Sequence, residues 1–310
     1  MLKFILVIML FFIACSANVT ELITPIPQNI KYDKQKALLG KKLFSDPRLS
    51  RDNTISCASC HNLSTGGDDN KQFSTGIDGK VGNINSPTVF NTTFNLSQLW
   101  SGKAKNLKDQ AYLSLFKSSV MDGNKTQIIE KLNQDAKYSA KFKTIFTDAI
   151  TIENVIDAIA EFEKALITPN SKFDKYLRGD KNSLNIDEKK GYKLFKSYGC
   201  ISCHNGVNIG GNLYQKFGII KQYKDITNQL GRYNVTANEE DKYHFKVPSL
   251  RNIELTAPYL HNRSIKTLAS TIEKMIVYQI GQTPNKEDIQ KIEAFLNTLT
   301  GDKPIILEKI

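Results

Sequence analysis

Four of the five cysteines in this 310-residue chain fall into two copies of the pattern Cys-x-x-Cys-His. Two thiols three positions apart can form thioethers to the two vinyl groups of one haem, while the adjacent histidine reaches its iron. Two copies of so specific a pattern predict two covalently bound haems c. The residues of the two copies are Cys57, Cys60, His61, Cys200, Cys203 and His204.

Two other uses of paired cysteines are open to a chain of this kind. The two Cys-x-x-Cys pairs could share one zinc ion, or a single pair could be a redox dithiol. The zinc alternative leaves both following histidines without a purpose, so the pattern favours haem.

The chain begins with a segment typical of export. Lys3 precedes an apolar run over residues 4–14, which is too short to cross a bilayer and is followed directly by Cys15. A small residue before a cysteine resembles the cleavage box of bacterial lipoproteins. The sequence predicts a signal peptide over 1–14, a lipid on Cys15, a polar tether over 15–32, and a periplasmic protein that touches the membrane only through that lipid. Ordinary cleavage without a lipid is the alternative.

Similar segments precede the two motifs. Gly40-Lys-Lys-Leu-Phe44 stands before the first motif and Gly191-Tyr-Lys-Leu-Phe195 before the second, and each ends an amphipathic stretch. Apolar residues recur at helical spacing, and no run of paired strands is evident. The predicted fold is mainly α, with two cytochrome c-like haem domains and long haem-lining loops. The N-terminal domain is expected over 33–180 and the C-terminal domain over 181–310.

The formal charge of +11 comes from 42 Lys and Arg against 31 Asp and Glu. A basic chain invites a comparison with nucleic-acid-binding proteins, but here the basic residues are scattered among acidic ones and form no block. The charge pattern therefore does not favour nucleic acid as a partner.

The sixth position of each iron decides between carrying electrons and doing chemistry. Beyond the leader the only methionines are Met121 and Met275, and the only histidines outside the motifs are His244 and His261. Met275 follows His204 by 71 positions, a separation common between the two axial ligands of a c-type domain, so the second haem is expected to be His/Met. The first haem is closed by Met121, left open, or bound by an unusual ligand.

With these motifs the sequence resembles the bacterial dihaem cytochrome c peroxidases, in the superfamily that also contains the MauG-type enzymes. The resemblance covers essentially the whole mature chain. The motifs that carry it include Asp46-Pro-Arg-Leu-Ser50, Asn85-Ser-Pro-Thr-Val-Phe-Asn91, Gln98-Leu-Trp100-Ser-Gly102-Lys-Ala104, Phe245-Lys-Val-Pro-Ser-Leu-Arg-Asn252 and Leu255-Thr-Ala-Pro-Tyr-Leu-His261.

The resemblance implies a cytochrome-c peroxidase. The second haem would accept electrons from a small donor protein of the cytochrome c or cupredoxin type and pass them to the first haem, where hydrogen peroxide is reduced to water. It implies Trp100 as the electron bridge, Met275 as an iron ligand, and a Ca²⁺ ion bound by the side chain of Asn85 and the carbonyl oxygens of Thr256 and Pro258. Many members are dimers, so a homodimer is one expectation.

The sequence departs from the family pattern at two places. Ile77 stands where many members have a removable histidine ligand, so the first haem is expected to be open without activation. The family's distal glutamate, a proton shuttle, falls on Val120. We expect the nearby Asp122 to replace it, with Gln110 positioning the peroxide.

Two other functions remain in view. In a dihaem electron carrier, Met121 would close the first haem. In a MauG-like oxidase, the substrate would be side chains of another protein. Met275 stands where MauG-type enzymes have tyrosine, and it therefore argues against the oxidase.

Overall fold

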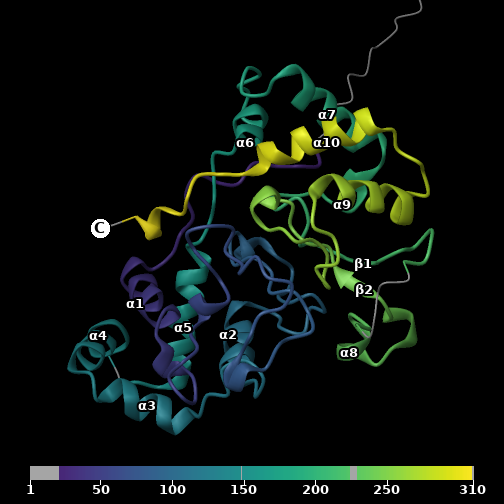
Figure 1. Ribbon diagram of the computed structural model, residues 1–310. Coiled ribbons are helices and arrows are strands. Elements are labelled where there is room, and N and C mark those ends of the chain that lie inside the picture. Colours follow the sequence, from purple (N-terminus) through teal and green to yellow (C-terminus); the bar gives the residue numbers. More distant parts are fainter. Residues whose placement is uncertain (1–20, 148, 224–228, 309–310) are drawn as a thin grey trace, which may run out of the picture.

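The computed structural model describes residues 21–147, 149–223 and 229–308, and it is mainly helical, as the sequence predicts (Figure 1). One two-stranded antiparallel sheet joins β1 (Tyr214–Lys216) to β2 (His244–Lys246). No helix among the described residues is long and apolar enough to span a membrane. The helices are α1 (Lys34–Phe44), α2 (Leu107–Phe116), α3 (Lys125–Asn133), α4 (Ala136–Phe146), α5 (Ile152–Lys164), α6 (Lys172–Leu177), α7 (Ile186–Ser197), α8 (Tyr233–Thr236), α9 (Leu268–Met275) and α10 (Lys286–Leu296).

In the first half of the chain, α1 packs directly on α5. A Cβ added to Gly40 would lie 1.9 Å from the carbonyl oxygen of Ala158, so only glycine permits this approach of the two helices. One turn further on, Phe44 meets Phe162 edge to face, with ring centroids 5.3 Å apart. The same Phe44 ring lies 6.3 Å from the ring of His61, which ties the helix pair to the first motif.

The second half repeats this packing with α7 and α10. A Cβ on Gly191 would lie 1.9 Å from the carbonyl oxygen of Lys291, and Phe195 lies 5.3 Å from Phe295. Phe195 is 6.5 Å from the ring of His204. The duplication seen in the sequence is therefore also a duplication of packing, with a glycine at each helix crossing and a phenylalanine beside each motif histidine.

The two helix groups surround separate hydrophobic cores, one built mainly from α1 to α5 and one mainly from α6, α7, α9 and α10 (Figure 1). The predicted division at residue 180 would leave α6 with the first core. Phe173 of α6 instead packs against Tyr192 at 4.8 Å and Phe295 at 4.9 Å, both in the second core. By packing, the division lies before α6.

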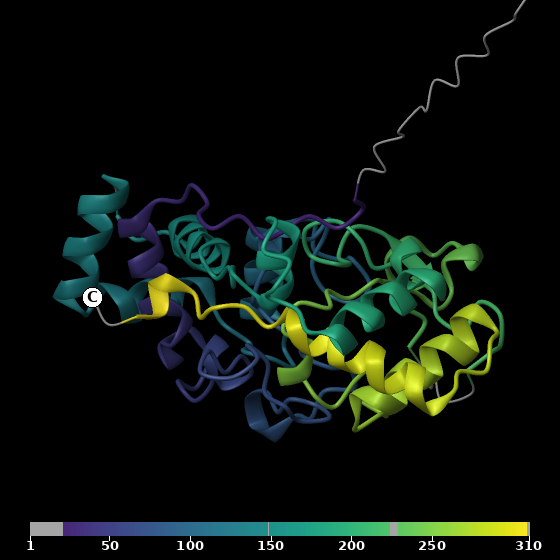
Figure 2. The same cartoon turned by 90° about the horizontal axis from the view of Figure 1, so that it is seen from above.

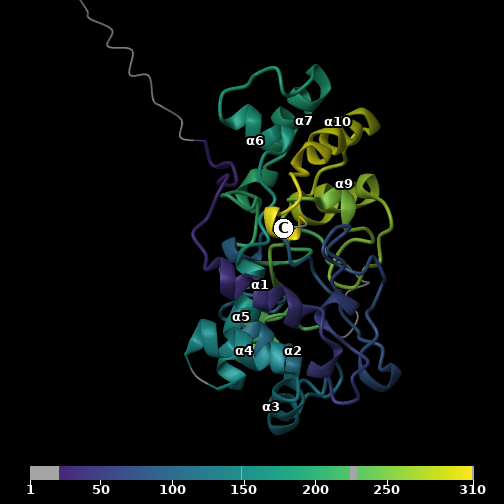
Figure 3. The ribbon, with the colours of Figure 1, turned by 90° about the vertical axis from the view of Figure 1, so that its left-hand side faces the viewer.

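The described part of the predicted tether, residues 21–32, is packed against the protein. Ile23 and Ile26 are fully buried, and the carbonyl oxygen of Thr24 accepts a hydrogen bond of 3.1 Å from Arg251. Figure 3 shows this segment running along the second half before it enters α1. A free tether over these residues is therefore wrong, because two buried isoleucines fix the segment. The predicted signal peptide over 1–14 and Cys15 lie outside the described residues.

The C-terminal segment crosses in the opposite direction. After α10 the chain returns to the first half, where Ile306 is buried in the first core and its carbonyl oxygen accepts a hydrogen bond of 2.7 Å from Lys41 (Figure 2). Each end of the described chain is thus packed on the half to which it does not belong, which joins the two halves.

Candidate functional site

The two motifs share one local structure. Cys57–Ser59 and Cys200–Ser202 are both 3-10 turns, and in each motif the N–H of the histidine donates to the carbonyl oxygen of the first cysteine at 3.0 Å. Side chains three positions apart lie over one another in such a turn. The two thiols of each motif therefore face the same side, as attachment to one haem requires.

The motif histidines are buried and fixed in one orientation. In the tautomer with a proton on Nδ1, His61 donates to the carbonyl oxygen of Gly67 at 3.1 Å and His204 to that of Ile209 at 3.4 Å. Burial lowers the pKa of both imidazoles, that of His204 to about 4. A neutral ring held by Nδ1 leaves the lone pair of Nε2 for an iron ion.

The thiols do not have the electrostatics of a redox dithiol. Burial raises the pKa of Cys57 and Cys60, and that of Cys200 to about 11. Dithiol exchange starts from a thiolate with a lowered pKa, so these values disfavour that use. Across the described ranges, no three His, Cys, Asp or Glu side chains are grouped so that they could hold a metal ion. Haem attachment is the use that fits these cysteines.

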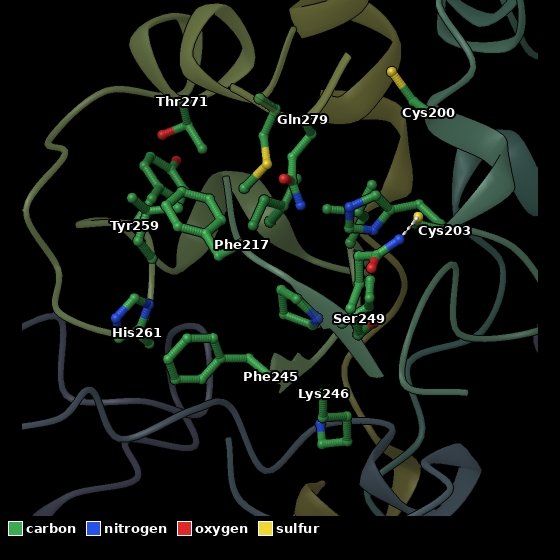
Figure 4. A pocket seen from close by; sticks show the side chains of 18 of the residues that line it. Cys200, Cys203, Phe217, Phe245, Lys246, Ser249, Tyr259, His261, Thr271 and Gln279 are labelled. Carbon is green, nitrogen blue, oxygen red and sulfur yellow. Dashed lines mark hydrogen bonds between the residues drawn. The ribbon is translucent and has the colours of Figure 1, made fainter. Parts of the chain in front are cut away.

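A cavity of about 360 Å³ lies beside the second motif (Figure 4). Cys200, Cys203 and His204 line it, and so does Met275, the last residue of α9. The helix continues past Met275 as a short π-helical turn over Ile276–Ile280, a distortion often found at functional sites. The structure therefore brings the predicted pair His204 and Met275 to one cavity.

The remaining cavity wall fits a haem. Most of it is apolar, but Lys246 is buried there with no carboxylate facing its ammonium among the described residues, and burial lowers its pKa to about 8. His261 also lines the cavity, and its buried Nε2 has no hydrogen-bond partner in the part of the chain that the structure describes. An apolar ring with two propionates would match both groups. Sequence reasoning placed His261 near the propionates of the second haem, but it did not identify Lys246.

Trp100 comes from the first half of the chain but lines the cavity of the second. Its indole Nε1 donates to the carbonyl oxygen of Asn85 at 3.1 Å, and its own carbonyl oxygen accepts from the N–H of Lys246 at 2.8 Å. The indole ring lies 6.1 Å from the ring of His261. The residue predicted to bridge the haems therefore lies where the two halves meet.

In the first half, the loop that carries Ile77 packs on the segment that carries Met121. The N–H of Ile77 donates to the carbonyl oxygen of Val120 at 2.9 Å, and a Cβ on Gly76 would lie 2.2 Å from the carbonyl oxygen of Ser119. Ile77 and Met121 are both buried. Of these two side chains, only the thioether of Met121 can bind iron.

The two predicted catalytic residues of the first half are in different environments. Gln110 is a residue of α2 whose Nε2 donates to Ser114 at 3.1 Å, while its Oε1 is buried and has no partner among the residues described. Asp122 instead accepts a hydrogen bond of 3.0 Å from Arg51 in a partly exposed ion pair. The structure does not support Asp122 as the proton shuttle, because a surface guanidinium already holds its carboxylate.

A buried carboxyl that was not predicted lies on α5. Glu163 is 3% exposed, its Oε2 has no hydrogen-bond partner within the described ranges, and burial raises its pKa to about 8. Glu163 follows Phe162 in α5. At the equivalent position of α10, the residue that follows Phe295 is the apolar Leu296. The sequence held a signal for it, because Glu163 falls on the apolar face of an amphipathic helix.

The predicted calcium ligands Asn85, Thr256 and Pro258 do come together, since all three line the cavity. The guanidinium of Arg263 already lies beside these residues. Arg263 lines the same cavity, and with its amide oxygen turned toward the guanidinium, Asn85 accepts from Nη2 at 2.9 Å and from Nε. The predicted ligand set therefore does not fit a Ca²⁺ ion in this structure, because a positive charge occupies the side-chain oxygen that the ion would need.

Comparison with known proteins identifies relatives over nearly the whole chain. Residues 34–182 match the family described as di-haem cytochrome c peroxidase. The chain is 49% identical to the cytochrome c551 peroxidase of Nitrosomonas europaea, over 92% of this chain and 85% of that protein. It is 46% identical to the cytochrome c peroxidase Ccp of Escherichia coli, over 91% of this chain but only 61% of that protein. Among solved structures, a MauG-like protein associated with microbial copper homeostasis superposes with a TM-score of 0.79 at 26% identity, covering 95% of this chain and 98% of that one.

Proposed function

The chain belongs to the di-haem cytochrome c peroxidase family and is an oxidoreductase acting on peroxide, and we propose that the two halves of its fold divide this reaction between two haems c. In this proposal both halves are cytochrome c-like haem domains. The bound haems supply the redox chemistry, in which two electrons and two protons convert one hydrogen peroxide into two waters. The protein's residues attach the haems, set the sixth position of each iron, place the peroxide and connect the two halves.

The observation that carries the proposal is the position of Trp100. It is a first-half residue in the wall of the second-half cavity, the same cavity that His204 and Met275 line. An indole between two redox centres provides a path for single electrons from one half to the other. This placement supports electron transfer between the second half and the first.

In the second half, Cys200 and Cys203 would attach the haem through thioether bonds, and His204 and Met275 would bind its iron. A thioether ligand raises the potential of a c-type haem, which suits an electron acceptor. The donor would be a small cytochrome c or cupredoxin.

In the first half, Cys57 and Cys60 would attach the haem and His61 would bind its iron. The Ile77 side chain cannot ligate, so the iron bound by His61 would be accessible to peroxide without prior activation. Gln110 is assigned to hold the peroxide, because its buried Oε1 lacks a partner among the described residues. Asp122 is not part of this proposal, because Arg51 engages it.

The location and assembly belong to the proposal as well. Export through the segment 1–14, lipid attachment at Cys15 and a homodimer suit a periplasmic peroxidase. Calcium is not included, since Arg263 stands at its expected position.

A second candidate function is electron transfer alone. It rests on Met121, which is buried in the first core on the segment that contacts the Ile77 loop. If its thioether bound the first iron, both haems would be six-coordinate and peroxide would be excluded. The MauG-like oxidase is less favoured, because Met275 lines the second cavity at the position where MauG-type enzymes have tyrosine.

Low-temperature electron paramagnetic resonance of the oxidised holoprotein separates these functions. We expect one high-spin signal from the open first haem and one low-spin signal from the His/Met second haem, together with peroxide turnover by the same sample. Two low-spin signals in the oxidised protein, with the first haem remaining low-spin when the second is reduced, and no turnover, would establish the electron carrier instead.

A further inference from the structure

Arg263 is a buried cation that connects the two halves of the molecule. Its side chain is 1% exposed, and its guanidinium pairs with the carboxylate of Asp68, which is 0% exposed. Its Nη1 donates to the carbonyl oxygen of Ala257 at 3.3 Å, and its Nη2 and Nε face the amide oxygen of Asn85. Asp68 and Asn85 belong to the first half, and Ala257 belongs to the second. One side chain thus gathers three oxygen groups from both sides of the interface.

The three oxygens around Arg263 are of the kinds that bind calcium in proteins, namely a carboxylate, an amide oxygen and a backbone carbonyl oxygen. A guanidinium offers several N–H donors in a fixed plane, so it can satisfy all three groups without a metal. A Ca²⁺ ion cannot join it, because two buried cations sharing these ligands would repel each other strongly.

The backbone at Arg263 has φ of +49°, in the left-handed region that a residue with a side chain seldom adopts. This conformation persists only where the surrounding contacts impose it. The ion pair with Asp68 and the bonds to Asn85 and Ala257 are contacts of that kind.

We propose that Arg263 takes the place of the inter-domain calcium ion, so that the protein carries its own fixed cation at this interface and neither binds nor needs calcium there. The proposal concerns the cation at the interface and does not depend on which haem reduces peroxide.

The guanidinium of Arg263 also helps to hold Trp100 in place. Asn85 is held by Arg263 through its side chain, its N–H donates to the carbonyl oxygen of His261 at 2.8 Å, and its carbonyl oxygen accepts from the indole of Trp100. Arg263 therefore fixes the peptide on which Trp100 rests. A metal ion is not required to hold that arrangement.

The wild-type holoprotein provides the first test. Calcium content is measured by inductively coupled plasma mass spectrometry after dialysis against millimolar CaCl₂ and then against calcium-free buffer, and thermal unfolding is followed with CaCl₂ or with EGTA. We expect substoichiometric calcium and the same midpoint in both buffers. One calcium per chain, or a midpoint that EGTA lowers, would overturn the proposal.

The second test removes the guanidinium. Arg263→Ala leaves Asp68, Asn85 and the carbonyl oxygens around a space without a cation, so CaCl₂ should raise its unfolding midpoint, and terbium luminescence should report binding. Arg251→Ala is the matched control, because Arg251 forms another fully buried pair, with Asp174 at 2.8 Å. It should be destabilised in a similar way, which separates the loss of a buried ion pair from the binding of calcium at the interface.

An Arg263→Ala protein that folds but does not respond to calcium would show that the guanidinium does not stand in for the ion. If Arg263→Ala does not fold, Arg263→Lys keeps a positive charge with fewer donors and should remain insensitive to calcium, while the wild-type measurement still decides the proposal. None of these measurements uses peroxide turnover, so their outcome is separate from that of the proposed function.

Discussion

The indole N–H of Trp100 donates a hydrogen bond of 3.1 Å to the backbone carbonyl oxygen of Asn85. The N–H of the same Asn85 donates to the carbonyl oxygen of His261, a residue of the second half, at 2.8 Å. Trp100 is therefore oriented by a peptide that is itself fixed across the interface. This arrangement makes the role of the indole testable apart from its role in packing.

Replacing Trp100 by Phe should slow electron transfer between the haems while leaving their attachment intact. Phenylalanine retains an aromatic ring but lacks the N–H and has a smaller π-system. We expect a loss of turnover on the order of tenfold, equivalent to about 1.4 kcal/mol of activation free energy. Stopped-flow oxidation of the reduced second haem by peroxide measures it. Phe245→Leu, which alters the ring stacked on His261 at 4.1 Å, is the control for packing. An unchanged rate in Trp100→Phe would exclude the bridge.

Replacing Met275 by Ala should open the second iron. If the thioether is its sixth ligand, the low-spin signal of the second haem should become high-spin and its midpoint potential should fall. Electron paramagnetic resonance and potentiometry follow the two effects. Met121→Leu serves as the comparison, and under the peroxidase proposal it leaves both signals as they are. A spectrum that changes in Met121→Leu instead would favour the electron carrier.

Replacing Gln110 by Leu should impair the reaction with peroxide. The substitution removes the buried amide, so we expect the second-order rate constant to fall on the order of a hundredfold, as it does when one preorganised hydrogen-bonding group is lost. Asp122→Asn is the control in the same half. The wild-type carboxylate of Asp122 is bound to Arg51, so turnover of this variant should stay at the wild-type level. Equal losses in both variants would return Asp122 to the mechanism.

The sequence predicted best those features of the site and of the helix packing that depend on short local patterns. The two Cys-x-x-Cys-His motifs and the repeated glycine and phenylalanine before each motif are local signals, recognised from the spacing of a single turn or helix. The structure places the second motif at a cavity with Met275, and the two glycines at equivalent helix crossings.

The features that escaped prediction depend on contacts between distant residues. Arg263 and Asp68 are separated by 195 positions, and the local sequence around each residue does not indicate that the two form an ion pair. Ile23 and Ile26 lie in a polar segment with prolines, a composition that predicts a tether. In the folded protein both side chains are buried against the second half. Burial and pairing of this kind are set by tertiary packing, so local composition does not show them.

The paired helix crossings lead to a prediction about stability. In Gly40→Ala the new methyl group would overlap the carbonyl oxygen of Ala158, so α1 and α5 must separate, at a cost of about 1–3 kcal/mol in the free energy of unfolding. Urea denaturation of the holoprotein measures this change. Gly82→Ala is the control, because there a Cβ meets nothing closer than 3.5 Å. Equal stability of the two variants would mean that the crossing adjusts freely.

Glu163 gives the protein a pH dependence whose sign can be worked out. Burial raises the pKa of this carboxyl from 4.5 to about 8, so between these values the folded protein holds a proton that the unfolded chain releases. The free energy of unfolding should therefore fall as the pH rises through this window, by up to about 5 kcal/mol at 1.36 kcal/mol per pKa unit. Glutamine cannot ionise, so Glu163→Gln should flatten the curve and be more stable than wild type above pH 8. Glu153→Gln, on the exposed face of the same helix, should keep the wild-type slope. Urea denaturation across the pH range compares the three proteins, and a Glu163→Gln curve as steep as the wild-type curve would show that this carboxyl is ionised in the folded protein.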